Sequence, residues 1–477
     1  MTGWDAGSTS VARNQSQGAA IVSFHPVRFL GATALALSFA ASAHAETPWV
    51  VKPEWVSAHE SFLASDALNG RGSATRDEAI AAAYVASQFE FYGLKPAPGM
   101  TGYLQTAVIV QPRLSGPAHF SVGTNEVAGL MLLTSSGQSV TGPVQVYAGE
   151  DPKGLPVGNI LLIQPSGKSP ISAWMRAAAA KGAKLVILRD SADTQQIFGI
   201  LGGKTSMTPH LDGETADHPR TNVVTLPAPA FDSLAAQNGT TVSLALPTVV
   251  EDRKVTTNAI GYLPGTDAKA GTLLYTAHLD HLGVKPDGTV MHGANDDASG
   301  TTAVLELAHA LAAGKPLRRS ILFVAYGSEE IGEFGSSYFA KHPPVPLTDI
   351  VANVEFEMIG AQDPKLPTNT LMMTGFSRSN LGETLKAHGA LVTDDPYPEQ
   401  SFFERSDNYQ LALQGIVAHT VSGWAVTPTY HQPTDNLANL NLPFMTAAIQ
   451  SLVEPARWLA DSDFTPQWKP GGKPEKK

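Results

Sequence analysis

The sequence of 477 residues contains no cysteine. This absence excludes disulfide bonds, thiolate zinc sites and cysteine nucleophiles together. Basic residues are also few. With 32 Lys and Arg against 43 Asp and Glu, the formal net charge is −11. An excess of negative charge argues against nucleic acid or an anionic membrane as the general partner.

Two common hydrolase motifs are missing as well. The chain has no G-x-S-x-G elbow, which disfavours a serine hydrolase of the α/β type. It also has no H-E-x-x-H motif, because His59-Glu60 is not followed by a second histidine at the required spacing. A thermolysin-type zinc site is therefore disfavoured.

Long apolar runs are absent apart from residues 29–43, which follow Arg28 and precede the small-residue motif Ala43-His44-Ala45. This pattern predicts a secretory signal that is removed before Glu46, and hence a periplasmic or secreted protein. The run is short for a transmembrane helix, although an N-terminal anchor helix remains the alternative. Apart from export, no membrane partner is expected.

The remaining composition is that of a globular chain long enough for two or three domains, with 43 Gly and 34 Pro in its loops. Changes in pattern along the chain divide it into five segments. These are a leader (1–45), an N-terminal part of the main domain (46–116), an insertion (117–250), the catalytic half (251–462) and a tail (463–477).

The N-terminal part carries two helical patterns, at residues 55–68 and 76–92. In the second pattern the apolar residues Ile80, Tyr84 and Phe91, together with Ala83, predict the buried face. The turn at residues 70–72 is interpreted as a helix-ending turn without a ligand.

The catalytic half alternates strand and helix patterns. The predicted strands are 273–277, 320–326, 350–356, 370–374 and 416–420, and the predicted helices are 300–313, 335–341, 379–388 and 442–461. This alternation predicts an α/β fold, a three-layer sandwich around a mainly parallel sheet. Side chains at the carboxyl ends of its strands would meet along one edge.

Residues that bind zinc stand after several of these strands. His278 and Asp280 follow the first strand, and Glu329-Glu330 follow the second. Glu357 ends the third. Two further positions, Asp296 and His431, lie in polar loops. Two histidines and three acids of this kind suit a pair of zinc ions that share one carboxylate.

Five motifs carry a resemblance to a known family. HLDHLG, GANDDASG, GSEEIGEFGS, FEMIG and YHQPTD, in this order, resemble the co-catalytic di-zinc aminopeptidases of metallopeptidase family 28. The resemblance extends from about residue 55 to residue 459. It implies two Zn²⁺ per chain, with Asp296 bridging the ions, His278 and Glu357 completing one site, and Glu330 and His431 completing the other.

The same resemblance implies roles for three more residues and an unusual peptide bond. Glu329 would be the general base that moves a proton from water to the leaving amine. Asp280 would orient His278. Tyr430 would stabilise the developing oxyanion, with an ordinary core tyrosine as the alternative. The peptide between Asp296 and Asp297 would be cis.

Two positions depart from the family pattern. Glu357 stands where Asp is more frequent, and Glu355 is the competing ligand because it points to the same face of a strand. At Arg405-Ser406-Asp407-Asn408 the usual Ser-Asp-His is absent, so Asp407 is left as a candidate wall of the substrate cleft.

Two histidines beside the site, His281 and His292, do not match the metal motifs. A role in orienting ligands stays open for them. Phe402, Phe403 and Trp424 are candidate walls of the specificity pocket.

The insertion alternates short β patterns with turns and has one Ala-rich helix at residues 171–181. NILLIQPSG and AAAAKGAKLVILRDS resemble a protease-associated (PA) domain. A lid that gates the substrate and a passive inserted module are equally compatible with this pattern.

Three functions remain. The leading one is a zinc aminopeptidase acting on peptides with a free N-terminus. A carboxypeptidase or a glutaminyl cyclase on the same fold is the first alternative, but cyclases use a single zinc. A non-catalytic peptide-binding protein is the second; it would be supported by loss of the base or a ligand, and none is lost.

Overall fold

The structure is a computed structural model that describes residues 48–166, 168–201, 203–215 and 220–475. The predicted export signal within residues 1–45 lies outside the described residues. No helix in the described part is long and apolar enough to cross a membrane.

The largest sheet has nine strands in the order β19-β18-β20-β17-β13-β16-β12-β1-β9. In chain order these are β1 (Leu104–Leu114), β9 (His210–Leu211), β12 (Val249–Leu263), β13 (Thr272–His278), β16 (Ser320–Tyr326), β17 (Ile350–Glu357), β18 (Leu371–Met373), β19 (Val392–Asp394) and β20 (Ala418–Ser422). The central strands β20, β17, β13 and β16 are parallel to one another. Antiparallel pairing of β12 with β16, of β1 with β12 and of β18 with β20 makes the whole sheet mixed.

Helices cover both faces of this sheet. On β13, Leu273, Tyr275 and Ala277 pack into one core, and Leu274 packs into the other, because successive side chains of a strand point to opposite faces. The first core is closed by α1 (Pro53–Leu63), α2 (Arg76–Phe91), α6 (Ser299–Ala312), α8 (Leu381–Ala387) and α10 (Leu442–Asp461). The second core is closed by α7 (Phe334–Lys341) and α9 (Asn408–Leu413). The predicted three-layer α/β sandwich is confirmed. The prediction of a flexible tail at residues 463–477 is wrong for its described part, because Phe464 and Trp468 pack against the first core and the Trp468 Nε1 atom donates to the carbonyl of Gly415 at 3.0 Å.

Helix α2 buries a face that only partly overlaps the one predicted. Phe91 is 79% exposed and Ala83 is also exposed. The buried residues of α2 are Glu78, Ala81, Ala82, Val85, Ala86 and Phe89. The prediction is confirmed for Ile80 and Tyr84, which are half-buried against the core, and wrong for Ala83 and Phe91. The Glu78 carboxylate accepts from the Thr257 N–H and the Thr256 hydroxyl, which compensates its burial.

The chain between β1 and β12 forms two smaller sheets and contributes β9 to the edge of the large one. The five-stranded one has the order β4-β10-β8-β7-β6, and the four-stranded one has the order β3-β2-β11-β5. Their strands are β2 (His119–Val122), β3 (Asn125–Glu126), β4 (Met131–Thr134), β5 (Val140–Pro143), β6 (Gln145–Gly149), β7 (Ile160–Pro165), β8 (Leu185–Arg189), β10 (Asn222–Leu226) and β11 (Thr241–Ala245).

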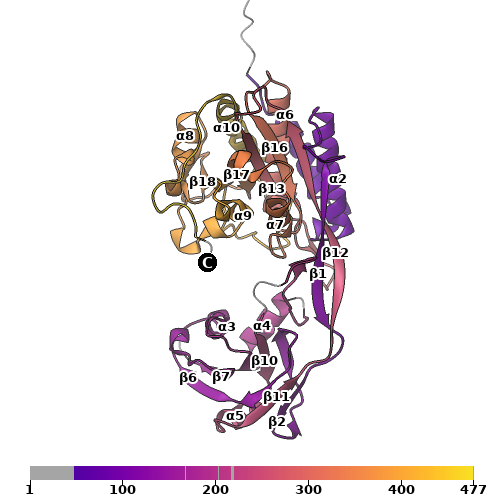
Figure 1. The fold of residues 1–477 in the computed structure, drawn as a ribbon, viewed down its shortest axis with the longest axis vertical. Helices are drawn as coiled ribbons and strands as arrows, with labels where there is room; N and C mark the ends of the chain where they lie inside the picture. Colours follow the sequence, from indigo (N-terminus) through magenta and orange to yellow (C-terminus); the bar gives the residue numbers. More distant parts are fainter. Residues whose placement is uncertain (1–47, 167, 202, 216–219, 476–477) are drawn as a thin grey trace, which may run out of the picture. The chain divides into compact units, whose positions relative to one another are not determined.

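The five-stranded sheet has a core on each face. One core joins it to the four-stranded sheet and to α5 (Ala228–Ala235). The other joins it to α3 (Ile171–Ala180) and α4 (Ala192–Ile200). The chain enters and leaves this segment along β1 and β12, which run side by side as a long antiparallel pair (Figure 1).

Candidate metal centre

The predicted ligands stand at the carboxyl ends of the central parallel strands. His278 is the last residue of β13, and Glu357 is the last residue of β17. Glu329 and Glu330 follow β16, which ends at Tyr326. Because these strands are parallel and adjacent, their ends bring the four side chains to one edge of the sheet.

Asp296 comes from the tight turn Ala294–Ala298 that precedes α6. The Asp435 carboxylate accepts from the backbone N–H groups of Asn295, at 2.8 Å, and Asp296, at 3.0 Å. The peptide bond between Asp296 and Asp297 is cis, as the resemblance implies. The turn is therefore held by Asp435, an acid that the sequence analysis did not single out.

Asp297 connects this turn to the two strands that carry ligands. Its carboxylate accepts from the backbone N–H groups of His278, at 3.3 Å, and Met358, at 3.0 Å. It also accepts from the N–H of Gly300 at 2.9 Å, at the start of α6. The side chain of Asp297 is thus a structural tie between β13, β17 and α6.

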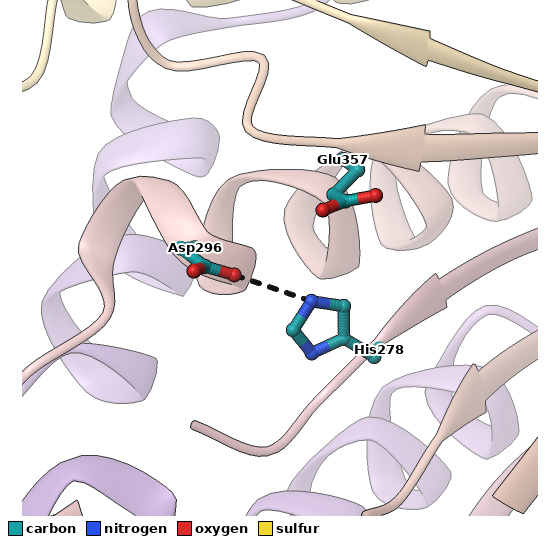
Figure 2. Close-up of side chains that lie close together, drawn as sticks. All are labelled: His278, Asp296 and Glu357. Atoms are coloured by element: carbon teal, nitrogen blue, oxygen red, sulfur yellow. Dashed lines mark ion pairs between the residues drawn. The ribbon is translucent and has the colours of Figure 1, made fainter. Parts of the chain in front are cut away.

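The first set of converging side chains, called here the first ligand group, is His278, Asp296 and Glu357. Each offers one ligand atom, and these atoms lie within 4.8 Å of one another. The His278 Nε2 atom is 3.2 Å from Asp296 Oδ1. Figure 2 shows the three side chains pointing toward one another.

A second ligand group shares Asp296 with the first. It contains His281, Asp296 and Glu330, again with ligand atoms within 4.8 Å of one another. His431 lies against the same acids, with Nε2 at 3.2 Å from Asp296 Oδ2 and 3.1 Å from Glu330 Oε2. The structure thus brings together the five predicted ligands and adds His281, which matched no metal motif.

Buried atoms without hydrogen-bond partners show that these groups fit metal ions. Within the described residues, neither ring nitrogen of His278 or of His281 has a hydrogen-bond partner, and Asp296 Oδ2 and Glu330 Oε1 also lack one. Leaving a buried polar atom unpaired costs about 1–3 kcal/mol. Imidazole nitrogens and carboxylate oxygens are the ligands that zinc binds in proteins. A bound ion at each group would satisfy the two carboxylate oxygens and one nitrogen of each ring.

The charges of the centre favour the same conclusion. Burial raises the pKa of Glu329 and of Glu357 above the ordinary range, because a buried carboxylate is poorly solvated. Burial lowers the pKa of His431, but its contacts with Asp296 and Glu330 outweigh this and raise it to about 10. Divalent cations among these acids would offset the cost of keeping them ionised.

Asp280 links the first ligand group to the Glu329-Glu330 turn. Its Oδ1 atom is 3.6 Å from His278 Nδ1 and accepts from the Glu329 N–H at 3.0 Å. Its Oδ2 atom accepts from the Glu330 N–H at 3.4 Å and from the Ser73 hydroxyl at 2.5 Å. Asp280 thus positions both acids of the turn, and Ser73 fixes Asp280.

Arg71 is a positioning residue that the sequence analysis missed. It is fully buried, and its Nε atom donates to the carbonyl of Leu279 at 2.8 Å. Its terminal nitrogens donate to the carbonyls of Leu63, His292 and Gly293. It therefore ties the segment after β13 to the loop before Asp296. The turn at residues 70–72 is interpreted from the sequence as a helix-ending turn because nothing in it resembles a metal ligand, and that criterion does not detect an arginine that bonds only backbone carbonyls.

The structure separates the two candidate acids of β17. Glu357 belongs to the first ligand group. Both oxygens of Glu355 are instead engaged: Oε1 accepts from the Ser406 hydroxyl at 3.0 Å, and Oε2 accepts from the Asn408 N–H at 2.5 Å and the Thr420 hydroxyl at 3.1 Å. Glu355 holds the start of α9, and its oxygens are not available to an ion.

A pocket lies beside the first ligand group. Its walls include Glu357, Met358, Met372, Phe402, Arg405 and Tyr430. Of the three aromatic residues expected there, Phe402 lines this pocket, whereas Phe403 packs in the second core of the sandwich. Asp407 is fully buried and does not line it.

Residues 258–454 match the model of peptidase family M28. This chain carries an M28 peptidase domain. The family inferred from the five motifs is confirmed, and so is the expectation of a metallo-aminopeptidase domain.

Curated relatives carry matching names. The chain is 27% identical over 368 residues to the probable lipoprotein aminopeptidase LpqL of Mycobacterium tuberculosis, which covers 67% of this chain and 68% of the relative. It is 31% identical over 199 residues to the aminopeptidase YwaD of Bacillus subtilis, covering 41% of this chain and 39% of the relative. The match to YwaD thus spans well under half of that protein.

Solved structures share the fold. An aminopeptidase from Aneurinibacillus sp. strain AM-1 superposes with a TM-score of 0.56 at 20% identity, covering 86% of this chain and 94% of its own. BSAP, a zinc aminopeptidase from Bacillus subtilis, superposes with a TM-score of 0.52 at 23% identity, covering 86% and 95%.

Proposed function

We propose that this M28 chain is an exported aminopeptidase that binds two zinc ions and releases N-terminal residues from peptides. The observation that carries the proposal is that two ligand groups share the carboxylate of Asp296. The names of the relatives support the choice of aminopeptidase, and the apolar run at residues 29–43 supports export to the periplasm or the medium. The substrates would be peptides with a free N-terminus, and no nucleic acid.

Bound zinc ions would supply an activated water and a Lewis acid for the scissile carbonyl. Glu329 acts beside them as general base, taking a proton from the attacking water and giving it to the leaving amine. Its position supports this role. Its backbone N–H is held by Asp280, and its charge interacts with those of His278 and Glu357, so the carboxylate lies next to the first ligand group.

Tyr430 is the candidate donor to the developing oxyanion. It lines the same pocket as Glu357, and its ring stacks on that of His431 with centroids 3.9 Å apart. A phenol O–H beside the metal centre is suited to stabilise negative charge on the carbonyl oxygen. The apolar walls of the pocket, Met358, Met372 and Phe402, would receive the side chain of the N-terminal residue.

The proposal is tested with purified protein, zinc analysis and matched substrate pairs. We expect about two zinc ions per chain, hydrolysis of aminoacyl p-nitroanilides, and no hydrolysis of the same compounds after N-acetylation. Hydrolysis that requires a free C-terminus would show a carboxypeptidase instead. Cyclisation of N-terminal glutamine with one zinc per chain would show a cyclase, and tight peptide binding without turnover would show a binding protein.

We further propose that residues 117–250 form an inserted PA-like domain that gates long substrates. The two smaller sheets with their own cores support a separate domain. Leu114 pairs with Val249, so the two strand ends are adjacent, and a short turn can replace the insertion. The shortened protein should keep its zinc and its activity on aminoacyl p-nitroanilides, and KM for long peptides should change. Unchanged kinetics on long peptides would make the domain passive.

A further inference from the structure

We propose that His281 is an additional metal ligand, so that the second ion is held by His281, Asp296, Glu330 and His431. This inference rests on the proposed zinc centre and concerns a residue outside its five predicted ligands. His281 lies three residues after His278 in the sequence, beyond the end of β13.

The contacts of His281 point to a shared ion. Its Nδ1 atom lies 2.7 Å from Glu330 Oε1 and 3.8 Å from Asp296 Oδ2. These nitrogen and oxygen atoms nevertheless lack hydrogen-bond partners, because the short contact between Nδ1 and Oε1 does not have hydrogen-bond geometry. A nitrogen atom and two carboxylate oxygens that lie close together without hydrogen bonds are the arrangement that one shared cation requires. Within the described residues, the Nδ1 atom of this fully buried ring would otherwise stay unsatisfied.

The ring of His281 is also fixed in place. Its backbone N–H donates to the carbonyl of Arg71 at 3.1 Å. Gly293 lies against the ring, and a Cβ atom at that position would come within 2.4 Å of the His281 Cγ atom. Gly293 also has a φ of +58°, which favours glycine there. The imidazole is therefore preorganised toward the carboxylates, which lowers the entropy cost of binding an ion.

The two ions would then be held unequally. The first ligand group offers one imidazole and two carboxylates, whereas the second offers two imidazoles and two carboxylates. Structural zinc sites with four protein ligands are closed sites, and catalytic ones keep a position open for water or substrate. We therefore expect the second site to bind its ion more tightly and to fill first.

The test is a metal titration of the full-length protein after its metals are removed. Zn²⁺ is added in competition with a chromophoric chelator, and Co²⁺ is added with its visible absorption recorded. The unmodified protein should show a tight and a weaker binding event. His281→Ala should lower the metal affinity of the tight event by at least about 10-fold and leave the weaker event unchanged. About 10-fold is the smallest loss usual for removing a residue that only supports a metal ligand, so loss of a ligand should cost at least as much.

Two further variants separate ligation from other roles. His292→Ala is the matched control, because His292 is bonded to Asp66 and stands outside both ligand groups; its titration should match that of the unmodified protein. His281→Asn keeps an amide N–H near the position of Nδ1 but has no imidazole lone pair. It should resemble His281→Ala. If His281→Asn restores tight binding, or if His281→Ala leaves both events unchanged, His281 is not a ligand.

Failure of this inference can be told from failure of the proposed function. If the unmodified protein hydrolyses aminoacyl p-nitroanilides and His281→Asn binds both ions as before, only the inference about His281 is overturned. Unmodified protein that shows the unequal, His281-dependent binding events but no hydrolysis would overturn the proposed activity alone. Thermal unfolding of the metal-free variants shows that each one is folded before titration.

Discussion

The two ligand groups share one carboxylate but are built in different ways. The first takes His278 and Glu357 from the last residues of two adjacent parallel strands. The second takes its other side chains from loops. His281 and Glu330 stand in the loops that follow β13 and β16, and His431 stands in a loop where its side chain is 34% exposed. Strand ends in a buried sheet fix side chains through the pairing of the backbone, whereas loop ligands depend on tertiary contacts. The comparison predicts a first group held mainly by the sheet and a second group that also relies on Arg71, which bonds the His281 N–H, and on Asp280, which bonds the Glu330 N–H.

Removing the shared carboxylate should have the largest effect. Asp296→Ala takes one ligand from both groups, so we expect zinc content to fall well below one ion per chain and activity to fall to background. The measurement is zinc analysis together with p-nitroanilide hydrolysis. Asp287→Ala is the control, because Asp287 is an exposed acid in the preceding loop. Two retained ions in Asp296→Ala would show that the groups are independent.

Replacing one acid of β17 should affect the first group alone. Glu357→Ala should lower zinc content toward one ion per chain and leave the second site filled. Glu355→Gln should keep both ions and lower the free energy of unfolding by about 1–3 kcal/mol, because its amide nitrogen would face the donors that now bond the carboxylate. Zinc analysis and thermal unfolding check both. The reverse pattern would make Glu355 the ligand.

Neutralising the proposed base should lower turnover without changing zinc binding by either ligand group. Glu329→Gln should lower kcat about 10²–10⁴-fold, the usual contribution of general acid–base catalysis, with zinc content unchanged. The adjacent Glu330→Gln is the informative contrast, since it should lose zinc from the second group. Full activity in Glu329→Gln would remove Glu329 from the mechanism.

Removing one hydroxyl should have the smallest effect. Tyr430→Phe keeps the ring that stacks on His431 and should lower kcat by about 10²-fold through loss of an oxyanion donor, while KM and zinc content change little. Steady-state kinetics on one p-nitroanilide substrate measure both constants. An unchanged kcat would assign Tyr430 to packing.

Much of this centre could be predicted because its residues follow buried strands. The patterns at residues 273–277, 320–326 and 350–356 each correspond to an observed strand, and the polar residues after them are the ones that meet. The burial of α2 was predicted only in part, since an amphipathic pattern does not show which acid, here Glu78, finds hydrogen-bond donors in the folded protein.

The amino-acid sequence alone determined the strands and helices of the catalytic half, the parallel centre of its sheet and the candidate side chains at strand ends, because burial periodicity and the positions where it stops are local properties of the chain. The resemblance carried by the five motifs supplied the assignment of these side chains to two ions. Tertiary structure decided the choice of Glu357 over Glu355, the burial of Arg71 between two loops, and the approach of His281 to Glu330. Each of these depends on which polar groups find hydrogen-bond partners in the folded protein, and the groups that meet lie far apart along the chain.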